Sequence, residues 1–475
     1  MNPFDLHFSR RQLLLYFGIC TTTGVLDAYA DTPVQPSADD EESAYQLAKQ
    51  AYLYGYPLVY FARFRQVRLS RVDAERATPY RWNALGHVNA PVGPTNVGAP
   101  QTDTFYSRLF HDVTTEPVLI KVPATDGRYW SLQMCDYLGT TFGMPSRRST
   151  PGPTVLAIVG PNWKGSLPAE VSQVFHAPMN MGFTIQRTYY AGAADMAKAA
   201  AQQTAFDARP LSAYLANSPW DGVDGSQVYK PATPAEDPLA DFKAMQHIWQ
   251  QSPPPRSEQS VWGHFAPLGL AVGARPVDSL PMHVKKGMAR AEAEVRALIV
   301  QTTRAVPGMR TANGWVLPKP SIGLFQDKDY LYRATVALFG TIATPVSENV
   351  YVVAQHEPGF KERLNGARRY ELHFSKANLP QADAFWSVHA YTDRYTLIPN
   401  PAAHYAVGDR TPGLAYNADG SLTVYLQYDS PGTANEANWL ATQQDQPFSL
   451  VIRAYEPKGQ IRDLTWQGPE IRVVG

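Results

Sequence analysis

Residues 128–136 read RYWSLQMCD and alternate between apolar and polar side chains, and this pattern indicates the fold class. An extended chain would place Trp130, Leu132 and Met134 on one face, and Tyr129, Ser131 and Gln133 on the other. This period of two predicts a strand that packs one face against a core.

Further strand-like segments lie on both sides of this stretch. They are residues 118–122, 154–159 and 183–190 in the first half of the chain, and residues 369–374, 385–391, 421–428, 448–455 and 471–474 in the last third. Helical patterns occupy residues 195–206, 241–250, 282–303 and 330–342. Residues 41–69 predict one more helix, which Pro57 interrupts late.

This order of segments predicts an α+β, strand-rich fold. We expect two β-sandwich or jelly-roll-like domains with a helical connector between them. The expected boundaries are a flexible leader at residues 31–40, a helix and the first sandwich at residues 41–190, the helical connector at residues 191–345, and the second sandwich at residues 346–475.

The N-terminus has the features of an export signal at residues 1–30. Arg10 and Arg11 precede an apolar run, and Ala28-Tyr29-Ala30 forms a small-x-small cleavage pattern. An arginine pair at this place predicts export of the folded chain by the twin-arginine machinery, cleavage after Ala30, and a periplasmic or secreted location. An ordinary Sec signal and a short N-terminal helix are the alternatives. The apolar run is too short for a stable membrane anchor.

Composition narrows the range of partners. Lys plus Arg and Asp plus Glu both total 42, so the formal net charge is zero and no basic face for a nucleic acid is expected. Cleavage after Ala30 would leave Cys135 as the single cysteine, which excludes an internal disulfide. We expect a small-molecule substrate or ligand as the partner, and a homo-oligomer is compatible with the sequence.

Sequence motifs that hold a nucleotide are absent. The chain has no Walker phosphate loop and no complete dinucleotide-binding loop, and we predict no cofactor. A metal stays open, because His373, His389 and His404 cluster in the last predicted domain and imidazole is a common metal ligand. Spacing alone fixes no geometry, so three unrelated histidines are the alternative.

Four polar residues are candidates for one catalytic pocket. Asp103 and Tyr106 lie three residues apart in QTDTFYS, while Arg128 opens and Asp136 ends the alternating strand. Asp103 would be a general acid or base and Tyr106 a proton donor. Arg128 would hold an anionic substrate, and Asp136 would orient Arg128. His389 is the candidate for a second acid or base. A buried network that only stabilises the fold is the alternative.

Aromatic side chains are candidates for substrate binding. They are Trp130, Trp386, Tyr391 and Trp439. Such rings can stack against sugars or aromatic ligands. The alternative is that the tryptophans are core residues whose indole N–H groups are hydrogen-bonded within the protein.

Several segments together resemble a known bacterial family. They are AYLYGYPLVY (51–60), DTFYS (103–107), VPATDGRYWSLQMCD (122–136), GPNWKG (160–165), RTYYAG (187–192), LPQADAFWSVHAY (379–391), NADGSLTVYL (417–426) and FSLVIRAYEP (448–457). In this order they are similar to exported proteins that combine an N-terminal domain of unknown function 1254 with a C-terminal domain of unknown function 1214. The resemblance implies two sandwich-like domains with helices between and around them, and it implies no reaction.

Three functional hypotheses follow from the sequence. The first is an exported, cofactor-free enzyme that acts on a small organic molecule at the domain junction by hydrolysis or proton transfer, since junctions often hold ligand clefts. The second is a non-catalytic periplasmic ligand-binding or envelope protein. The third is a metalloprotein that uses the histidines of the last domain.

Overall fold

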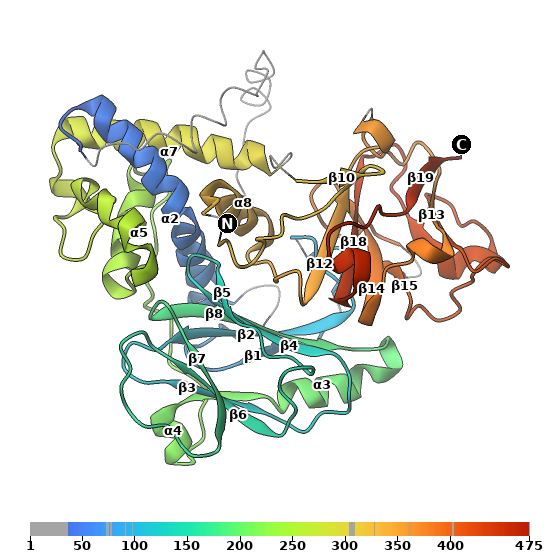
Figure 1. The fold of residues 1–475 in the computed structure, drawn as a ribbon, viewed down its shortest axis with the longest axis horizontal. Coiled ribbons are helices and arrows are strands. Elements are labelled where there is room, and N and C mark those ends of the chain that lie inside the picture. Colours follow the sequence, from blue (N-terminus) through green and yellow to red (C-terminus); the bar gives the residue numbers. More distant parts are fainter. Residues whose placement is uncertain are drawn as a thin grey trace.

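Two β-sandwiches and a group of helices make up the molecule (Figure 1). The first sandwich lies at the bottom of this view, the second lies at the right, and most of the long helices lie at the upper left. This computed structural model describes residues 37–474 apart from residues 73–75, 77, 91, 97, 304–308, 327, 361 and 401–402. The predicted export signal lies outside the described residues. The predicted strand-rich α+β class is confirmed.

The first sandwich pairs a five-stranded sheet with a four-stranded sheet. The larger sheet has the order β1-β2-β8-β4-β5, with β1 (Gly86–Val88), β2 (Thr104–Asp112), β4 (Trp130–Asp136), β5 (Thr141–Gly143) and β8 (Met181–Tyr189). The smaller sheet has the order β7-β6-β3-β9, with β3 (Val118–Val122), β6 (Thr154–Val159), β7 (Val171–His176) and β9 (Asp207–Pro210). Trp130, Leu132 and Met134 pack in the core between the sheets, as the alternating pattern of β4 predicts.

Strand β9 extends the first sandwich beyond the expected boundary at residue 190. It pairs antiparallel with β3, with Leu119 opposite Arg209. Helix α3 (Met196–Thr204) precedes β9 and packs on β2 and β8. The first domain therefore continues to Pro210, and only the chain after it is connector.

Helix α2 (Glu41–Ser70) is the axis of the helical group. Around it pack α5 (Ala240–Gln251), α7 (Met282–Thr302) and α8 (Tyr330–Gly340). The shorter helices are α4 (Leu211–Leu215), α6 (Gln259–Trp262) and α9 (Gly459–Arg462). Within the described part of the chain, no helix is long and apolar enough to span a bilayer.

Pro57 does not interrupt α2, which continues to Ser70. A proline inside a helix removes one backbone hydrogen bond and usually kinks the helix. Here the residues on both sides of the proline are buried, among them Tyr54 and Phe61, and this packing keeps the helix continuous. The C-terminal half of α2 also lies on the larger sheet of the first sandwich, where Phe64 makes an edge-on contact with Phe183. Helix α2 thus joins the helical group to the first sandwich.

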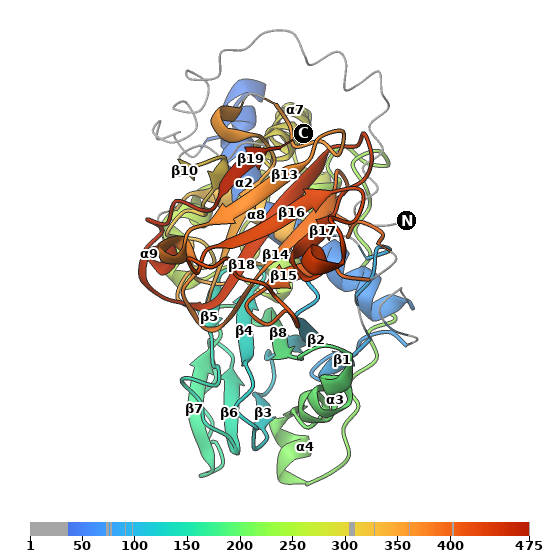
Figure 2. The same ribbon diagram turned by 90° about the vertical axis from the view of Figure 1, so that its right-hand side faces the viewer.

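The second sandwich pairs a six-stranded sheet with a four-stranded sheet. The six-stranded sheet has the order β10-β11-β12-β18-β14-β15, with β10 (Thr311–Ala312), β11 (Trp315–Val316), β12 (Asn349–Ala354), β14 (Ala382–Thr392), β15 (Ala406–Gly408) and β18 (Phe448–Pro457). The four-stranded sheet, in front in Figure 2, has the order β17-β16-β13-β19, with β13 (Tyr370–Phe374), β16 (Leu422–Gln427), β17 (Trp439–Ala441) and β19 (Glu470–Val473). Because β10 and β11 belong to the six-stranded sheet, the second sandwich begins at Thr311, before the expected boundary at residue 346.

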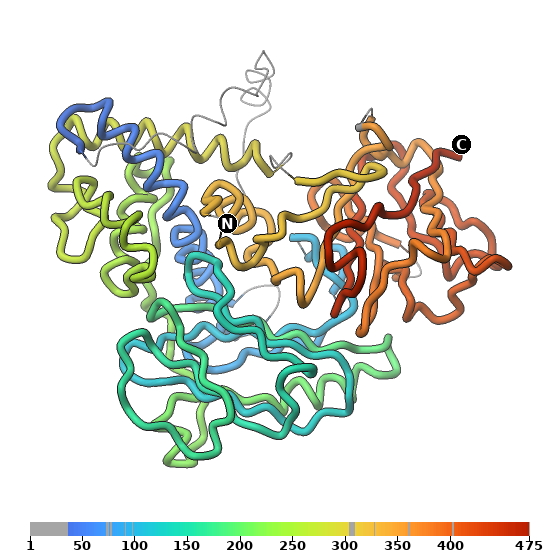
Figure 3. Tube along the Cα trace, in the orientation of Figure 1, coloured from blue at the N-terminus to red at the C-terminus, as the bar shows by residue number. Residues whose placement is uncertain are grey.

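A segment of the first half of the chain crosses to the second sandwich before β2 begins. Figure 3 traces this light-blue segment to the second sandwich. Ala99 N–H donates to the Tyr395 carbonyl at 2.8 Å, and the Tyr391 hydroxyl donates to the Pro100 carbonyl at 2.8 Å. The two sandwiches are therefore joined by hydrogen bonds close to the start of β2.

Candidate functional site

A cavity of about 890 Å³ lies where the two sandwiches and the helices meet. We call it the junction cavity. Its walls come from β2 and β8 of the first sandwich, β12 and β18 of the second, the C-terminal half of α2, and α8. Most of the lining is apolar, including Val67, Ile185, Val336, Phe339, Val353 and Val451. Domain junctions are frequent places for small-molecule sites, and this volume lies within their usual size range.

Two buried arginines from the two sandwiches line the junction cavity. Arg187 lies on β8 and Arg453 on β18, and their exposed fractions are 4% and 5%. Arg187 donates through Nη2 to Gln133 Oε1 at 3.1 Å, and Arg453 donates through Nη2 to the Ala99 carbonyl at 2.8 Å. No carboxylate in the described residues lies within 4.0 Å of either guanidinium.

Part of each guanidinium has no hydrogen-bond partner among the described residues. This applies to Nε and Nη1 of Arg187 and to Nη1 of Arg453. A guanidinium carries five N–H donors, and burying a charge without a partner is unfavourable by several kcal/mol. Two such groups beside one cavity therefore form a ready site for an anion.

Each arginine is opposite a tyrosine on the neighbouring strand. Tyr106 on β2 is the register partner of Arg187, and Tyr351 on β12 is the register partner of Arg453. The guanidinium carbons lie 6.0 Å from the Tyr106 ring centre and 5.5 Å from the Tyr351 ring centre. Ring faces stabilise such cations in part without neutralising them. Burial raises the pKa of Tyr106, so its phenol stays protonated.

Asp103 lies at the boundary of the two sandwiches, outside the residues that line the junction cavity. Ser387 Oγ of β14 donates to Asp103 Oδ2 at 2.7 Å. Burial raises the pKa of Asp103 to about 6, although the Ser387 hydrogen bond and the charge of Arg453 act in the opposite direction. Asp103 thus ties the first sandwich to the second.

His389 belongs to the same interdomain contact. Its Nε2 accepts from Thr102 N–H at 3.2 Å and lies 3.9 Å from Asp103 Oδ2. Burial and the charge of Arg453 hold the pKa of His389 well below its ordinary value, so the ring is neutral and forms no ion pair with Asp103. This arrangement supports a positioning role for His389 at the interface.

Arg128 and Asp136 do not meet, which corrects the expectation that Asp136 orients Arg128. Arg128 lies two positions before β4 and Asp136 is the last residue of β4, so the length of the strand separates them by about 20 Å. Arg128 pairs with Asp126 and Asp195, each at 2.8 Å. Asp136 Oδ1 accepts from the N–H groups of Leu138 and Thr140, both at 2.9 Å, in the turn after β4.

The four aromatic candidates lie outside the residues that line the junction cavity. Trp130 belongs to the core of the first sandwich and Trp386 to that of the second. The indole N–H of Trp439 donates to the Gln427 carbonyl at 2.9 Å. Tyr391 lies behind Arg453, with its ring centre 5.5 Å from the guanidinium carbon. The core placement of that alternative therefore describes Trp130 and Trp386, but the indole N–H of Trp130 has no hydrogen-bond partner among the described residues.

The histidines of the second sandwich do not converge. His373 lies on β13 and His389 on β14, which belong to different sheets. Across the described residues, no three His, Cys, Asp or Glu side chains are grouped so that they could hold a metal ion. The metal-binding alternative built on His373, His389 and His404 thus lacks a geometry that supports it.

Arg187 and Arg453 were missed as site residues, although a signal was present in the sequence. Each arginine interrupts a strand that is otherwise rich in apolar and aromatic residues, in FTIQRTYY and in FSLVIRAYEP. A charge at the centre of a strand that is buried on both faces indicates a function or a partner.

The family comparisons bear on both sandwiches. Residues 82–210 match the family described as protein of unknown function DUF1254. Residues 348–459 match the family described as protein of unknown function DUF1214. The chain carries both domains, in the predicted order. Arg187 lies in the DUF1254 region and Arg453 in the DUF1214 region, so the junction cavity is built where the two regions face each other.

The structural comparisons concern the fold. The VPA0106 protein from Vibrio parahaemolyticus has a similar structure, with a TM-score of 0.69 at 22% identity over 91% of this chain and all of that chain. An uncharacterised protein from Burkholderia cenocepacia matches at a TM-score of 0.45 and 14% identity, over 89% of this chain and 88% of that chain. No curated protein matches the chain.

Proposed function

We propose that the chain binds a small organic anion with an apolar body in the junction cavity. The observation that carries the proposal is the pair Arg187 and Arg453, two buried guanidiniums without a carboxylate partner in the described residues, beside a mostly apolar cavity. A carboxylate, sulfonate or phosphate on the ligand would accept from the N–H groups that lack partners. Planar guanidiniums suit such groups because they donate two parallel hydrogen bonds.

The lining of the cavity supports an apolar body on the same ligand. Side chains such as Val67, Phe339 and Val353 offer dispersion contacts and no hydrogen bonds. Burial of apolar surface contributes about 25 cal/mol per Å², while the ion pairs fix the orientation of the ligand. Small inorganic anions would use only half of this site.

Native mass spectrometry of the purified full chain tests the proposal. We expect a bound organic anion in the unaltered chain and its loss in Arg187→Met and Arg453→Met, because methionine fills volume without charge. Arg275→Met is the matched control, since Arg275 is exposed and lies outside the cavity lining. Retention of the same molecule by both cavity variants would contradict the proposal.

A cofactor-free enzyme at this cavity is the second candidate function. Tyr106 favours it, because its protonated phenol lines the cavity beside Arg187 and can donate a proton to a bound substrate. The geometry gives Asp103 no place in such a step, since other side chains line the cavity. Once a ligand is identified, Tyr106→Phe should retain its binding and lose any turnover.

Export of the folded chain is part of the same proposal. Its support is Arg10 and Arg11 before the apolar run, together with the cleavage pattern that ends at Ala30. A periplasmic or secreted location would let the chain meet small molecules outside the cytoplasm. The twin-arginine machinery would then be a transient partner.

A further inference from the structure

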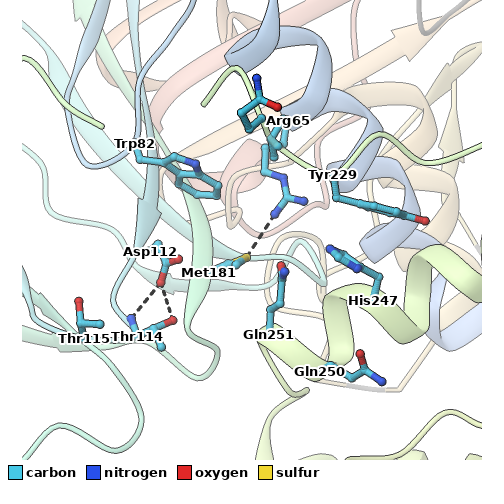
Figure 4. Close-up of a pocket in the computed structure, with 12 residues that line it drawn as sticks. Arg65, Trp82, Asp112, Thr114, Thr115, Met181, Tyr229, His247, Gln250 and Gln251 are labelled. Carbon is cyan, nitrogen blue, oxygen red and sulfur yellow. Dashed lines mark hydrogen bonds between the residues drawn. The ribbon is translucent and has the colours of Figure 1, made fainter. Parts of the chain in front are cut away.

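A second cavity, of about 620 Å³, opens on the other side of α2, at the ends of β2 and α5. We call it the Arg65 cavity, and its lining includes Arg65, Trp82, Asp112, Met181, Tyr229 and His247. Figure 4 shows Arg65 pointing into it between the rings of Trp82 and Tyr229. Its lining shares no residue with the junction cavity.

Arg65 is a buried cation, and no carboxylate of the described residues lies within 4.0 Å of its guanidinium. Its exposed fraction is 1%, its Nη1 donates to the sulfur of Met181 at 3.2 Å, and its Nε has no partner among the described residues. A thioether is a weak acceptor. The guanidinium carbon also lies 5.5 Å from the Trp82 ring centre, a contact that stabilises the charge only in part. The cavity therefore offers a donor for a carboxylate.

Asp112 supplies the opposite charge in the same cavity. Its Oδ1 accepts from the backbone N–H of Thr114 at 2.9 Å and from the Thr114 hydroxyl at 2.5 Å, whereas Oδ2 accepts no hydrogen bond from the described residues. Asp112 and Arg65 form no ion pair within 4.0 Å, so each is available to a ligand. A cavity that holds one positive and one negative group, not paired with each other, suits a ligand that carries both charges.

The remaining wall is uncharged and combines aromatic side chains with the amides of Gln227, Gln250 and Gln251. The His247 ring stacks on the Tyr229 ring with 3.8 Å between their centres, and His247 Nε2 has no partner among the described residues. Burial and the charge of Arg65 lower the pKa of His247, so the ring adds no second positive charge. The net charge of the lining is then zero, which disfavours a simple anion.

We propose that the Arg65 cavity is a second binding site, distinct from the junction cavity, that takes a small zwitterion of the α-amino-acid class. The carboxylate of the ligand accepts from the Arg65 guanidinium, and its ammonium group donates to Asp112 Oδ2. The ligand side chain lies against Tyr229 and His247. Binding by both charged ends excludes molecules that carry only one of them.

Thermal unfolding of the full chain with each of the twenty common amino acids, at about 10 mM, tests this site, because a ligand raises Tm when it binds only the folded state. We expect at least one amino acid to raise Tm. Isothermal titration calorimetry then compares the best of them with its deaminated and its carboxamide analogues. Each analogue should bind at least about tenfold more weakly, since each leaves one charged group of the cavity unpaired.

Two variants assign the binding to this cavity. Arg65→Met and Asp112→Asn should each weaken the amino acid at least about tenfold, and the exposed control Arg275→Met should leave its affinity unchanged. Asp112→Asn keeps the acceptor for Thr114, so it carries the test if Arg65→Met fails to fold. Absence of any Tm rise, equal binding of the deaminated analogue, or full affinity in Asp112→Asn would overturn the proposal.

Discussion

At the residue scale, the unusual feature is that charges are buried in the middle of strands. Arg187 and Arg453 each occupy a central strand of a sheet, where apolar side chains are the rule. Neither has a carboxylate within ion-pair distance in the described residues, and each lies by a tyrosine ring. Such an arrangement reduces stability in the absence of a ligand and favours a ligand with the opposite charge.

Arg453→Met should raise stability and abolish ligand binding. Replacing a buried charge with an apolar side chain of similar volume is often neutral or stabilising, here by about 1–3 kcal/mol, although the hydrogen bond to the Ala99 carbonyl is lost. We expect the Tm of the ligand-free chain to be equal or higher. A fall in Tm by more than about 5 °C would mean that Arg453 is a structural residue.

Asp136→Asn should remove a pH dependence of stability. Burial raises the pKa of Asp136 from 3.8 to about 7, so between these values the unfolded chain loses a proton that the folded chain keeps. The unfolded state is thereby favoured as pH rises from about 4 to about 7, by at most about 4 kcal/mol. The asparagine variant escapes this loss and retains an acceptor for Leu138 and Thr140.

The measurement for Asp136 is the Tm of both chains at about pH 4.5 and about pH 7.5. Relative to the unaltered chain, Asp136→Asn should gain stability at the higher pH. The control is Asp429→Asn, because Asp429 is exposed. Equal differences in Tm at the two pH values would argue against burial as the dominant influence on Asp136.

The residue types in the sequence indicated the segments near the junction cavity better than they indicated the individual residues that line it. Tyr106 of β2 does line the junction cavity, whereas Asp103 directly precedes β2 and lies outside the cavity lining. Arg128 is expected from the sequence to hold an anionic substrate, but in the structure it forms an ion pair with Asp126, two positions earlier. Local ion pairs of this kind compete with any ligand, and spacing along a strand does not reveal them.

At the element scale, α2 organises the molecule because three other helices and a sheet pack on it. The pattern of residues 41–69 predicted this helix to within one residue of its observed end. The effect of Pro57 was not predictable, since it depends on packing against helices that are distant in the sequence. Strands β9, β10 and β11 escaped prediction because two to four residues are too few for a periodic pattern.

Gly287→Ala should destabilise the contact between α7 and α2. In an open helix this change stabilises by about 1 kcal/mol. At Gly287 a Cβ would lie 2.6 Å from the Glu41 carbonyl oxygen and 2.7 Å from Tyr45 N, and backbone atoms cannot move aside easily. We expect a loss of about 1–3 kcal/mol, measured as a lower Tm.

The matched control for that change is Gly340→Ala in α8, where nothing lies within 4 Å of the added carbon. Gly340→Ala should leave Tm unchanged or raise it. Equal stability of Gly287→Ala and the control would contradict a close backbone contact between α7 and α2.

At the scale of the whole molecule, the proposed binding site lies between the two domains rather than within one of them. The DUF1254 region contributes Arg187 and Tyr106, and the DUF1214 region contributes Arg453 and Tyr351. The sequence predicted the two sandwiches and a site at their junction, but pairs of residues more than 200 positions apart are set by docking of the domains. This explains why the two arginines of one site could not be matched from the sequence.

Export by the twin-arginine route should fail when both arginines become lysine. The variant that combines Arg10→Lys and Arg11→Lys keeps the charge and loses the guanidinium pair on which the proposed twin-arginine signal depends. We expect the chain to accumulate in the cytoplasm, as measured by cell fractionation and immunoblotting. Unchanged export of the variant would favour the Sec alternative.

Calorimetric titration of octanoate and of 1-octanol into the purified chain is the most direct test of the central claim. The two probes share an apolar chain and differ in the anionic group. Octanoate should bind at least about tenfold more tightly than 1-octanol, a difference of about 1.4 kcal/mol, and the double variant Arg187→Met with Arg453→Met should lose this preference. Equal affinities, or a preference that survives in the double variant, would contradict an anion site formed by these two arginines.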